Sequence, residues 1–113
     1  MPYLSIKTTR TLTLQQELAL KESAGKLITL LPNKVEENLM MHIEDNQVMY
    51  FKGKEMDCCM MDLRLFGTID FESKKKFTQE FMKSVAKITD VPVDNQYLAI
   101  GEFENWGKKG DLF

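Results

Sequence analysis

The sequence predicts an α+β fold: two β-α-β units that form one mixed four-stranded sheet with two helices on one face. Two observations carry this prediction. Each half of the chain contains segments whose apolar residues alternate, as in a strand, and one segment whose apolar residues recur at spacings of three and four, as in a helix. In each half the order is strand, helix, strand, which favours a parallel, right-handed unit. At 113 residues and 13.1 kDa the chain is predicted to be a single domain over residues 1–113.

The first half begins with a strand in which Pro2, Leu4 and Ile6 share one face. Thr13 and Gln16 have the spacing of a capping box, which predicts that a helix begins there. The helical spacing continues until a proline at position 32 ends it. The strands predicted for this half are residues 2–8, 38–43 and 47–51.

The second half repeats this order after a loop at residues 52–54. Residues 58–66 read as a strand with leucines at 63 and 65 on one face and Asp62 and Arg64 on the other. A second helix is indicated by four apolar residues at helical spacing, namely Phe77, Phe81, Val85 and Ile88. The last predicted strand is residues 97–103. A sheet covered on one face only predicts that the other face is buried by association with further copies of the chain.

Composition excludes several classes of protein. The net charge of −2 gives no general attraction to nucleic acid or to an anionic membrane, and no apolar run has the length of a transmembrane helix. Cys58 and Cys59 are adjacent and would point to opposite faces of a strand, so a bridge between them is not expected. With one histidine, His42, interpreted as structural, we expect no metal site and no cofactor. A cytoplasmic location follows as the default, with secretion without a signal peptide left open.

Pro2 is the first candidate for chemistry. Initiator methionine is normally removed before a proline, so Pro2 is expected to become the first residue and to carry a free secondary amine. Burial or a nearby cation would lower the pKa of that amine, because both disfavour its charged form. A neutral amine near pH 7 can act as a general base.

Longer motifs complete the pattern, and the chain resembles the macrophage migration inhibitory factor family of the tautomerase superfamily. The resemblance covers the whole chain. It rests on Pro2, on the pair 33–34 after the first helix, on 41–43 and 47–53, on Leu63, Gly67 and Ile69, on Tyr97, and on the tail 105–113.

This resemblance implies a homotrimer whose sheets face inward, with active sites at the subunit interfaces and Pro2 as the catalytic residue. It implies that Lys34 binds a substrate carboxylate and that the backbone N–H of Phe66 touches the substrate. It also implies an aromatic wall, to which Tyr97 comes across the interface and Trp106 and Phe113 come from the tail.

Each role has a plainer alternative. Lys34 would otherwise be a solvated loop lysine, and Tyr97 a buried tyrosine of the interface. Arg64 lies where mammalian members have a histidine near the mouth of the pocket, and it is either a second carboxylate anchor or a surface salt-bridge partner.

The chain also departs from the mammalian family pattern. Ala99 replaces an asparagine near the substrate, Asn38 replaces a pocket tyrosine, and Lys108 replaces an aromatic residue. A more basic and less aromatic pocket predicts a weaker preference for aromatic keto acids. Cys58 and Met61 stand at the two positions of the family's C-x-x-C motif, so a two-thiol mechanism is not available.

These observations favour a cofactor-independent keto-enol tautomerase acting on a keto acid such as phenylpyruvate. The alternative is a cytokine-like trimer that binds a protein receptor and has a vestigial pocket; such binding should survive Pro2→Gly, whereas tautomerisation should not. A third class, the related hydratases and decarboxylases, generally needs paired arginines around the proline. Arg10 and Arg64 are the only arginines of this chain.

Overall fold

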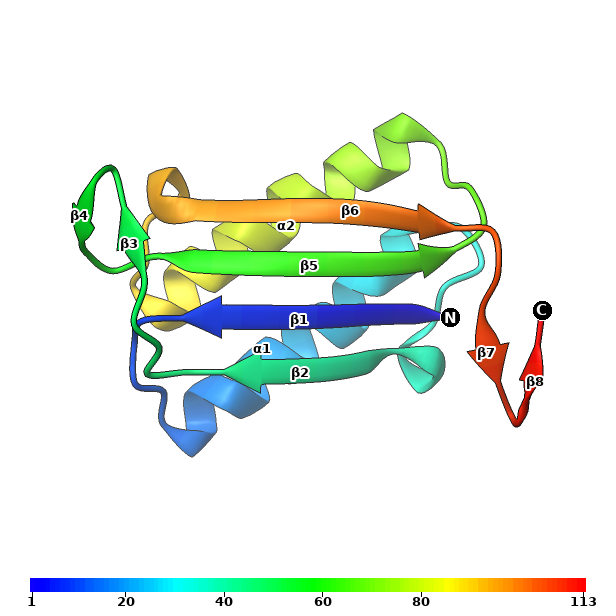
Figure 1. Ribbon diagram of the computed structural model, residues 1–113, viewed down its shortest axis with the longest axis horizontal. Helices are drawn as coiled ribbons and strands as arrows, with labels where there is room; N and C mark the ends of the chain where they lie inside the picture. The colour runs from blue at the N-terminus through cyan, green and yellow to red at the C-terminus, as the bar shows by residue number, and fades with distance from the viewer.

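The computed structural model describes residues 1–113 and contains the predicted sheet with both helices on one face (Figure 1). The strands of the sheet stand in the order β2-β1-β5-β6. Strands β1 and β2 are parallel, β5 and β6 are parallel, and β1 runs antiparallel to β5, which joins the two halves. The sheet strands and helices are β1 (Pro2–Thr8), α1 (Leu14–Leu27), β2 (Met40–Glu44), β5 (Cys59–Phe66), α2 (Phe71–Thr89) and β6 (Gln96–Phe103).

The core lies between the sheet and the helices. The strand side chains that point toward the helices are apolar and fully buried, among them Leu4, Ile6, Met61 and Leu63. They pack against the buried faces of both helices, where Phe77 and Phe81 of α2 are the largest fully buried side chains. This is the alternation that the sequence predicts for β1 and β5, because successive residues of a strand point to opposite faces.

Helix starts follow the local sequence. The capping box predicted at the start of α1 is present, with Thr13 accepting from the Gln16 backbone N–H and the Gln16 side chain accepting from the Thr13 N–H. Asp70 caps α2 through the backbone N–H of Ser73, and this bond lowers the pKa of the Asp70 carboxyl. No helix has the length and apolarity that crossing a membrane requires.

The strand predicted at residues 47–51 is wrong in extent. Only Tyr50–Phe51 (β3) is a strand, and it pairs with Lys54–Glu55 (β4) in a hairpin outside the main sheet. Lys52 and Gly53 both have positive φ, the conformation of a two-residue hairpin turn, so the chain folds back at once. Before the hairpin, the backbone N–H of Gln47 donates to the Thr8 carbonyl at the end of β1, and that of Asn46 donates to the Arg10 carbonyl.

Smaller boundaries also differ. Helix α1 ends at Leu27 and a 3₁₀ turn, Ile28–Leu30, carries the chain to the proline at position 32. Asn38 belongs to a second 3₁₀ turn, Glu36–Asn38, so β2 begins at Met40 and not at residue 38. A C-terminal hairpin, β7 (Gly107–Lys108) and β8 (Asp111–Leu112), was not predicted. A further 3₁₀ turn, Val93–Asn95, precedes β6.

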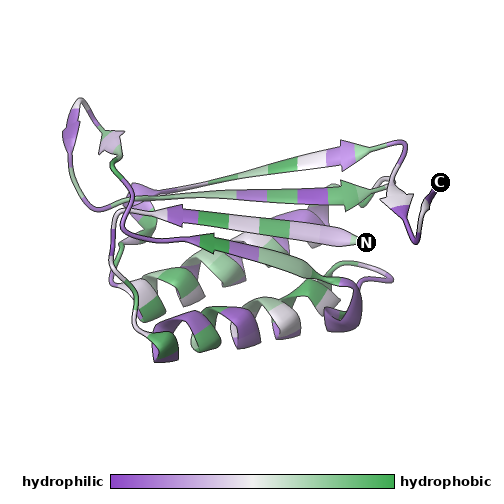
Figure 2. Ribbon diagram, turned by 60° about the horizontal axis from the view of Figure 1, so that its bottom comes forward, coloured by the Kyte–Doolittle hydropathy of each residue, from purple (hydrophilic) through white to green (hydrophobic).

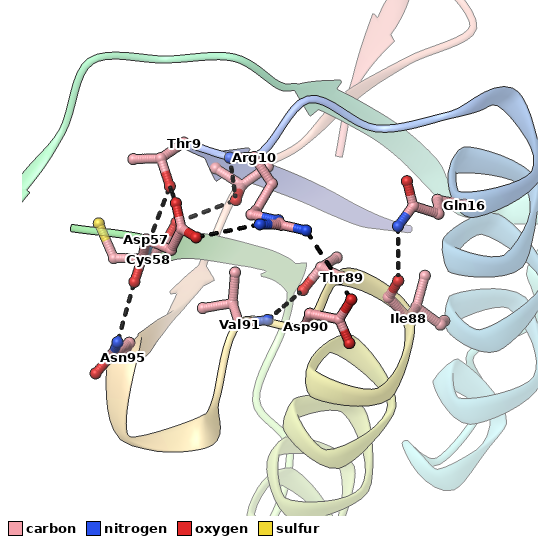
Figure 3. Close-up of polar contacts among 11 residues, drawn as sticks. Thr9, Arg10, Gln16, Asp57, Cys58, Ile88, Thr89, Asp90, Val91 and Asn95 are labelled. Carbon is pink, nitrogen blue, oxygen red and sulfur yellow. Dashed lines mark hydrogen bonds and ion pairs between the residues drawn. The ribbon is translucent and has the colours of Figure 1, made fainter.

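A polar network holds the end of the sheet where β1 finishes (Figure 3). Arg10 lies 3.3 Å from the Asp57 carboxylate and 3.9 Å from that of Asp90. Asp57 also accepts from the Thr9 hydroxyl, and its backbone carbonyl accepts from the Asn95 amide. Arg10 therefore ties together the segments at this end of the sheet. Within one chain it lies at the opposite end from Pro2 and is not paired with Arg64.

The second face of the sheet is uncovered (Figure 2). It carries alternate residues of the four strands. The exposed large apolar side chains on this face include Met40, Tyr97 and Phe103. The open sheet face that the sequence predicts is therefore present in the single chain, and its burial by further copies of the chain stays a prediction.

Candidate active site

A hollow of about 690 Å³ opens at the end of the sheet where β1 begins. Because β1 is antiparallel to β5 and β5 is parallel to β6, the start of β1 meets the ends of β5 and β6 there. The C-terminal hairpin lies at the same end (Figure 1). The lining residues are Met1, Pro2, Tyr3, Asn38, Met40, Arg64, Phe103, Asn105, Trp106, Gly107, Lys108 and Lys109.

Pro2 is buried at the start of β1, opposite Leu65 of β5. Met1 precedes it, and its terminal amine has a pKa lowered from 8.0 to about 6. Burial is the main cause; the positive charge of Lys34 and its hydrogen bond come next, and the charge of Lys108 adds to them. This end of the chain therefore holds an amine in its neutral form near pH 7.

Lys34 lies close to this amine. It follows Asn33, whose positive φ makes the turn after α1, and its Nζ donates a hydrogen bond of 3.3 Å to the Phe66 carbonyl. Lys34 is half-buried and makes no salt bridge, so its charge is not neutralised by a carboxylate of the chain. Phe66 is the last residue of β5. The backbone N–H of Gly67, which follows it, donates a hydrogen bond of 2.9 Å to the Phe103 carbonyl.

Arg64 points from β5 onto the open face of the sheet, as its alternation predicts. Its guanidinium carbon lies 5.7 Å from the centre of the Tyr3 ring, and no carboxylate lies within 4.0 Å of it. The sequence left two interpretations of Arg64, and the single chain contains no partner for the one in which Arg64 forms a surface salt bridge. The guanidinium lines the hollow and no carboxylate of the chain neutralises its charge.

The C-terminal hairpin supplies one wall. Trp106 lines the hollow and packs edge-on against Phe103 with ring centres 6.3 Å apart. The backbones of Trp106 and Phe113 exchange two hydrogen bonds, of 3.0 and 2.9 Å, which close the hairpin. The Phe113 side chain is 55% exposed and is not part of the lining of the hollow in a single chain.

Tyr97 lies at the other end of the sheet in the same chain. It is opposite Met60 near the start of β5, whereas Pro2 is opposite Leu65 near its end, a separation of roughly 17 Å along the strand. Its ring packs edge-on against Phe51 at 5.2 Å and is 62% exposed. One chain therefore does not bring Tyr97 to Pro2.

Sequence analysis missed several residues of the hollow as site residues. Tyr3, Met40 and Phe103 line it from the open face, and Lys108 lies close enough to lower the pKa of the terminal amine. The hairpin that carries Lys108 had a signal, because a residue followed by glycine, here Lys109 and Gly110 with positive φ, is typical of a two-residue hairpin turn.

His42 has partners that the sequence did not indicate. Its Nδ1 lies 3.4 Å from the Tyr3 hydroxyl, and its Nε2 lies 3.5 Å from the Glu44 carboxylate. The Tyr3 contact connects β1 and β2 across the open face of the sheet, and the Glu44 contact lies within β2. They agree with a structural role for His42. No group of His, Cys, Asp and Glu side chains in the chain could hold a metal ion.

Cys58 and Cys59 are both free thiols and both buried. Burial is the main cause that raises the pKa of each thiol, and the charge of Asp57 raises both further. We therefore expect the native protein to react with a disulfide reagent much more slowly at mildly alkaline pH than the urea-unfolded chain, because the thiolate is the reacting form. Time-resolved thiol labelling in the two states measures this; equal rates would contradict it.

The model of the macrophage migration inhibitory factor family matches residues 1–113. None of the curated proteins compared with the chain matches it in sequence. Among solved structures, the chain is similar to MIF2 of Leishmania major, with 19% identity, coverage of 100% of this chain and 97% of that one, and a TM-score of 0.92.

Two further structures show the same likeness in fold. A macrophage migration inhibitory factor homologue of Prochlorococcus marinus has 19% identity, coverage of 98% of each chain and a TM-score of 0.88. A protein designated Pt0534, which was inactivated by 2-oxo-3-pentynoate, has 14% identity, coverage of 96% of this chain and 93% of that one, and a TM-score of 0.83.

Proposed function

The chain belongs to the macrophage migration inhibitory factor family, and on this premise we propose that it is a cofactor-independent keto-enol tautomerase. Its substrate would be an enolisable 2-oxo acid, with phenylpyruvate as the test compound. The observation that carries the proposal is the lowered pKa of the terminal amine of Met1, which stands next to Pro2 beside two lysines and in a hollow large enough for a small acid.

The proposed catalyst is the amine of Pro2 after Met1 is removed. In the direction from enol to ketone, the neutral amine accepts the proton of the enol hydroxyl as the C2 carbonyl forms. The protonated amine then delivers a proton to C3, which returns the amine to its neutral form. One group serves as base and acid, so no cofactor enters the reaction.

The remaining residues bind and orient the acid. Lys34, which has no carboxylate partner and lies beside the amine, would hold the substrate carboxylate. The backbone N–H of Phe66 would touch the substrate, and Trp106 would form the apolar wall. Arg64 lies on the lining of the hollow and would be a second cation for the substrate.

Support for a 2-oxo acid also comes from Pt0534, which the 2-oxo acid 2-oxo-3-pentynoate inactivates.

We propose a homotrimer as the active form. Three open sheet faces turned inward would cover the exposed apolar residues of this face. Tyr97, which lies at the far end of its own chain, would then reach the hollow of the neighbouring subunit. Each site would combine Pro2 and Lys34 of one chain with Tyr97 of the next, and Phe113 would lie at the junction.

The test is the ultraviolet decay of enol phenylpyruvate with untagged protein whose mass shows Pro2 as the first residue. We expect decay well above the buffer rate. Protein of the same sequence whose mass shows that Met1 is retained is the comparison. Its Pro2 nitrogen is an amide and cannot accept a proton, so any activity that it keeps belongs to the Met1 amine. No decay above buffer with verified Pro2-terminal trimer would overturn the phenylpyruvate assignment.

Lys34→Met should weaken binding of the substrate carboxylate and change the pH dependence of kcat/KM. We expect kcat/KM to fall by about 10–100-fold, the value of a hydrogen bond to a charged group. The amine acts in its neutral form, so activity is lost as pH falls through its pKa. Lys34 lowers the pKa of the terminal amine of Met1, and its charge is expected to act in the same direction on the pKa of the Pro2 amine after Met1 is removed, so its removal should move the acidic limb of the kcat/KM profile to higher pH. Profiles for wild type, Lys34→Met and the exposed Lys87→Met test this; an unmoved limb would show that Lys34 does not act on the amine.

A further inference from the structure

The charge of the hollow is opposite to that of the chain. The protein has a net charge of −2, yet the residues that line the hollow include Arg64, Lys108 and Lys109 and no aspartate or glutamate. Lys34 adds a fourth positive charge beside the terminal amine. None of these four cations has a carboxylate within 4.0 Å. A cleft lined by one sign of charge attracts ligands of the opposite sign.

Several carboxylates lie close in the chain to these walls, and none of them forms an ion pair with the four cations. Glu102 lies in β6 next to Phe103, but it accepts from the Ile69 backbone N–H at 2.6 Å and binds Lys74 at 3.0 Å. Asp111 stands opposite Lys108 in the hairpin, but its carboxylate accepts from the Leu112 backbone N–H at 2.8 Å. The positive charge of the hollow is therefore left for a ligand.

The cations come from separate elements and form two groups. Lys34 is fixed at the end of β5 by its bond to the Phe66 carbonyl. Arg64 and Lys108 stand on the lining itself, one on the open sheet face and the other on the C-terminal hairpin. The aromatic rings of the lining are already engaged, since Arg64 lies over Tyr3 and Phe103 packs against Trp106. The lining thus offers a second anionic subsite beside the apolar wall of Trp106.

We propose that the substrate of this hollow is an oxo acid with two carboxylates, one bound at Lys34 and the second at Lys108 and Arg64. This inference deepens the proposed tautomerase function and rests on the same site. Lys108 and Arg64 become the residues that determine specificity, in favour of a dicarboxylate over an aromatic monocarboxylate. The bidentate geometry of a guanidinium suits a carboxylate at this subsite.

The test uses fumarate and crotonate, two acids with the same four-carbon skeleton, of which crotonate has a methyl group in place of one carboxylate. Neither requires turnover. Calorimetric titration of Pro2-terminal trimer at low salt should show fumarate binding about tenfold or more tightly than crotonate, from the added hydrogen bonds between charged groups. Lys108→Met should remove most of this difference, and Arg64→Gln should reduce it.

Lys87→Met is the matched control, because it removes the same charge from an exposed position near the end of α2. It should leave the fumarate preference unchanged. Equal affinity of wild type for the two acids would overturn the proposal, and so would an equal loss of the preference in Lys87→Met and Lys108→Met.

Enol substrates separate the two proposals. If enol phenylpyruvate and the enol of oxaloacetate, a 2-oxo dicarboxylate, both decay at the buffer rate, the tautomerase function fails, while the fumarate preference still decides the second subsite. If both are converted, the inference requires a higher kcat/KM for the dicarboxylate. A kcat/KM that is equal or higher for phenylpyruvate would overturn it and leave the tautomerase function standing.

Discussion

Pro2→Gly is expected to lower kcat/KM for ketonisation of enol phenylpyruvate by about 100-fold, the lower end of what general acid–base catalysis contributes. Methionine is also removed before glycine, so the variant retains a terminal amine, which is why a complete loss is not expected. The loss arises because the secondary amine of the proline ring, whose lone pair has a direction fixed by the ring, becomes a primary amine that rotates freely about its N–Cα bond. The lone pair then points less often toward the enol oxygen and C3.

The experiment compares wild type and Pro2→Gly by ultraviolet decay, with masses that confirm the first residue of each. Pro92→Gly is the matched control, because Pro92 is an exposed proline in the turn after α2 and its replacement should leave kcat/KM almost unchanged. Size-exclusion chromatography shows whether the assembly is kept. A Pro2→Gly trimer with the rate of wild type would remove Pro2 from the mechanism.

Phe81→Ala is expected to lower the free energy of unfolding by about 3–5 kcal/mol, the usual cost of truncating a buried aromatic residue. Phe81 is 0% exposed, and its ring stacks on that of Phe77 with centres 5.4 Å apart. The truncation would leave a cavity between α2 and the sheet, because β-sheet and helix backbones relax only in part around a missing side chain. Urea unfolding followed by circular dichroism measures the loss.

Phe71→Ala provides the comparison on the same helix. Phe71 is 68% exposed in the first turn of α2, so its truncation should change stability by about 0.5 kcal/mol or less. Both variants must be unfolded at one protein concentration, because association would make the midpoint depend on concentration. If the two truncations cost the same, the packing of α2 on the sheet is not what stabilises the domain.

Local sequence was enough to predict the strands and helices that face the core. The alternation of Leu4 and Ile6 in β1, and of Met61, Leu63 and Leu65 in β5, gives the buried face without reference to any distant residue. The capping box at Thr13 gives the start of α1 in the same way. Such patterns are local because the periods of helix and strand are set by the backbone alone.

Sequence failed where a segment is short or where pairing depends on a turn. The hairpins β3–β4 and β7–β8 have strands of two residues each, too short to show alternation. Their positions depend on positive φ at Lys52 and Lys109, each followed by glycine. In both hairpins the lysine-glycine pair at the turn is the feature of the sequence that indicates a hairpin.

The sequence by itself determined the order of the elements, the core face of each strand and the candidate amine at Pro2. Only the tertiary structure decided what stands around that amine. Lys34, Arg64 and Lys108 come from segments far apart in the chain. Arg64 and Lys108 line the hollow and Lys34 lies beside the terminal amine, because antiparallel pairing of β1 with β5 brings the start of one strand to the end of the other. Electrostatic effects on an amine depend on distance in space, which a linear pattern does not contain. For the same reason Tyr97, at the far end of its own sheet, can be assigned to a site only through the arrangement of several chains.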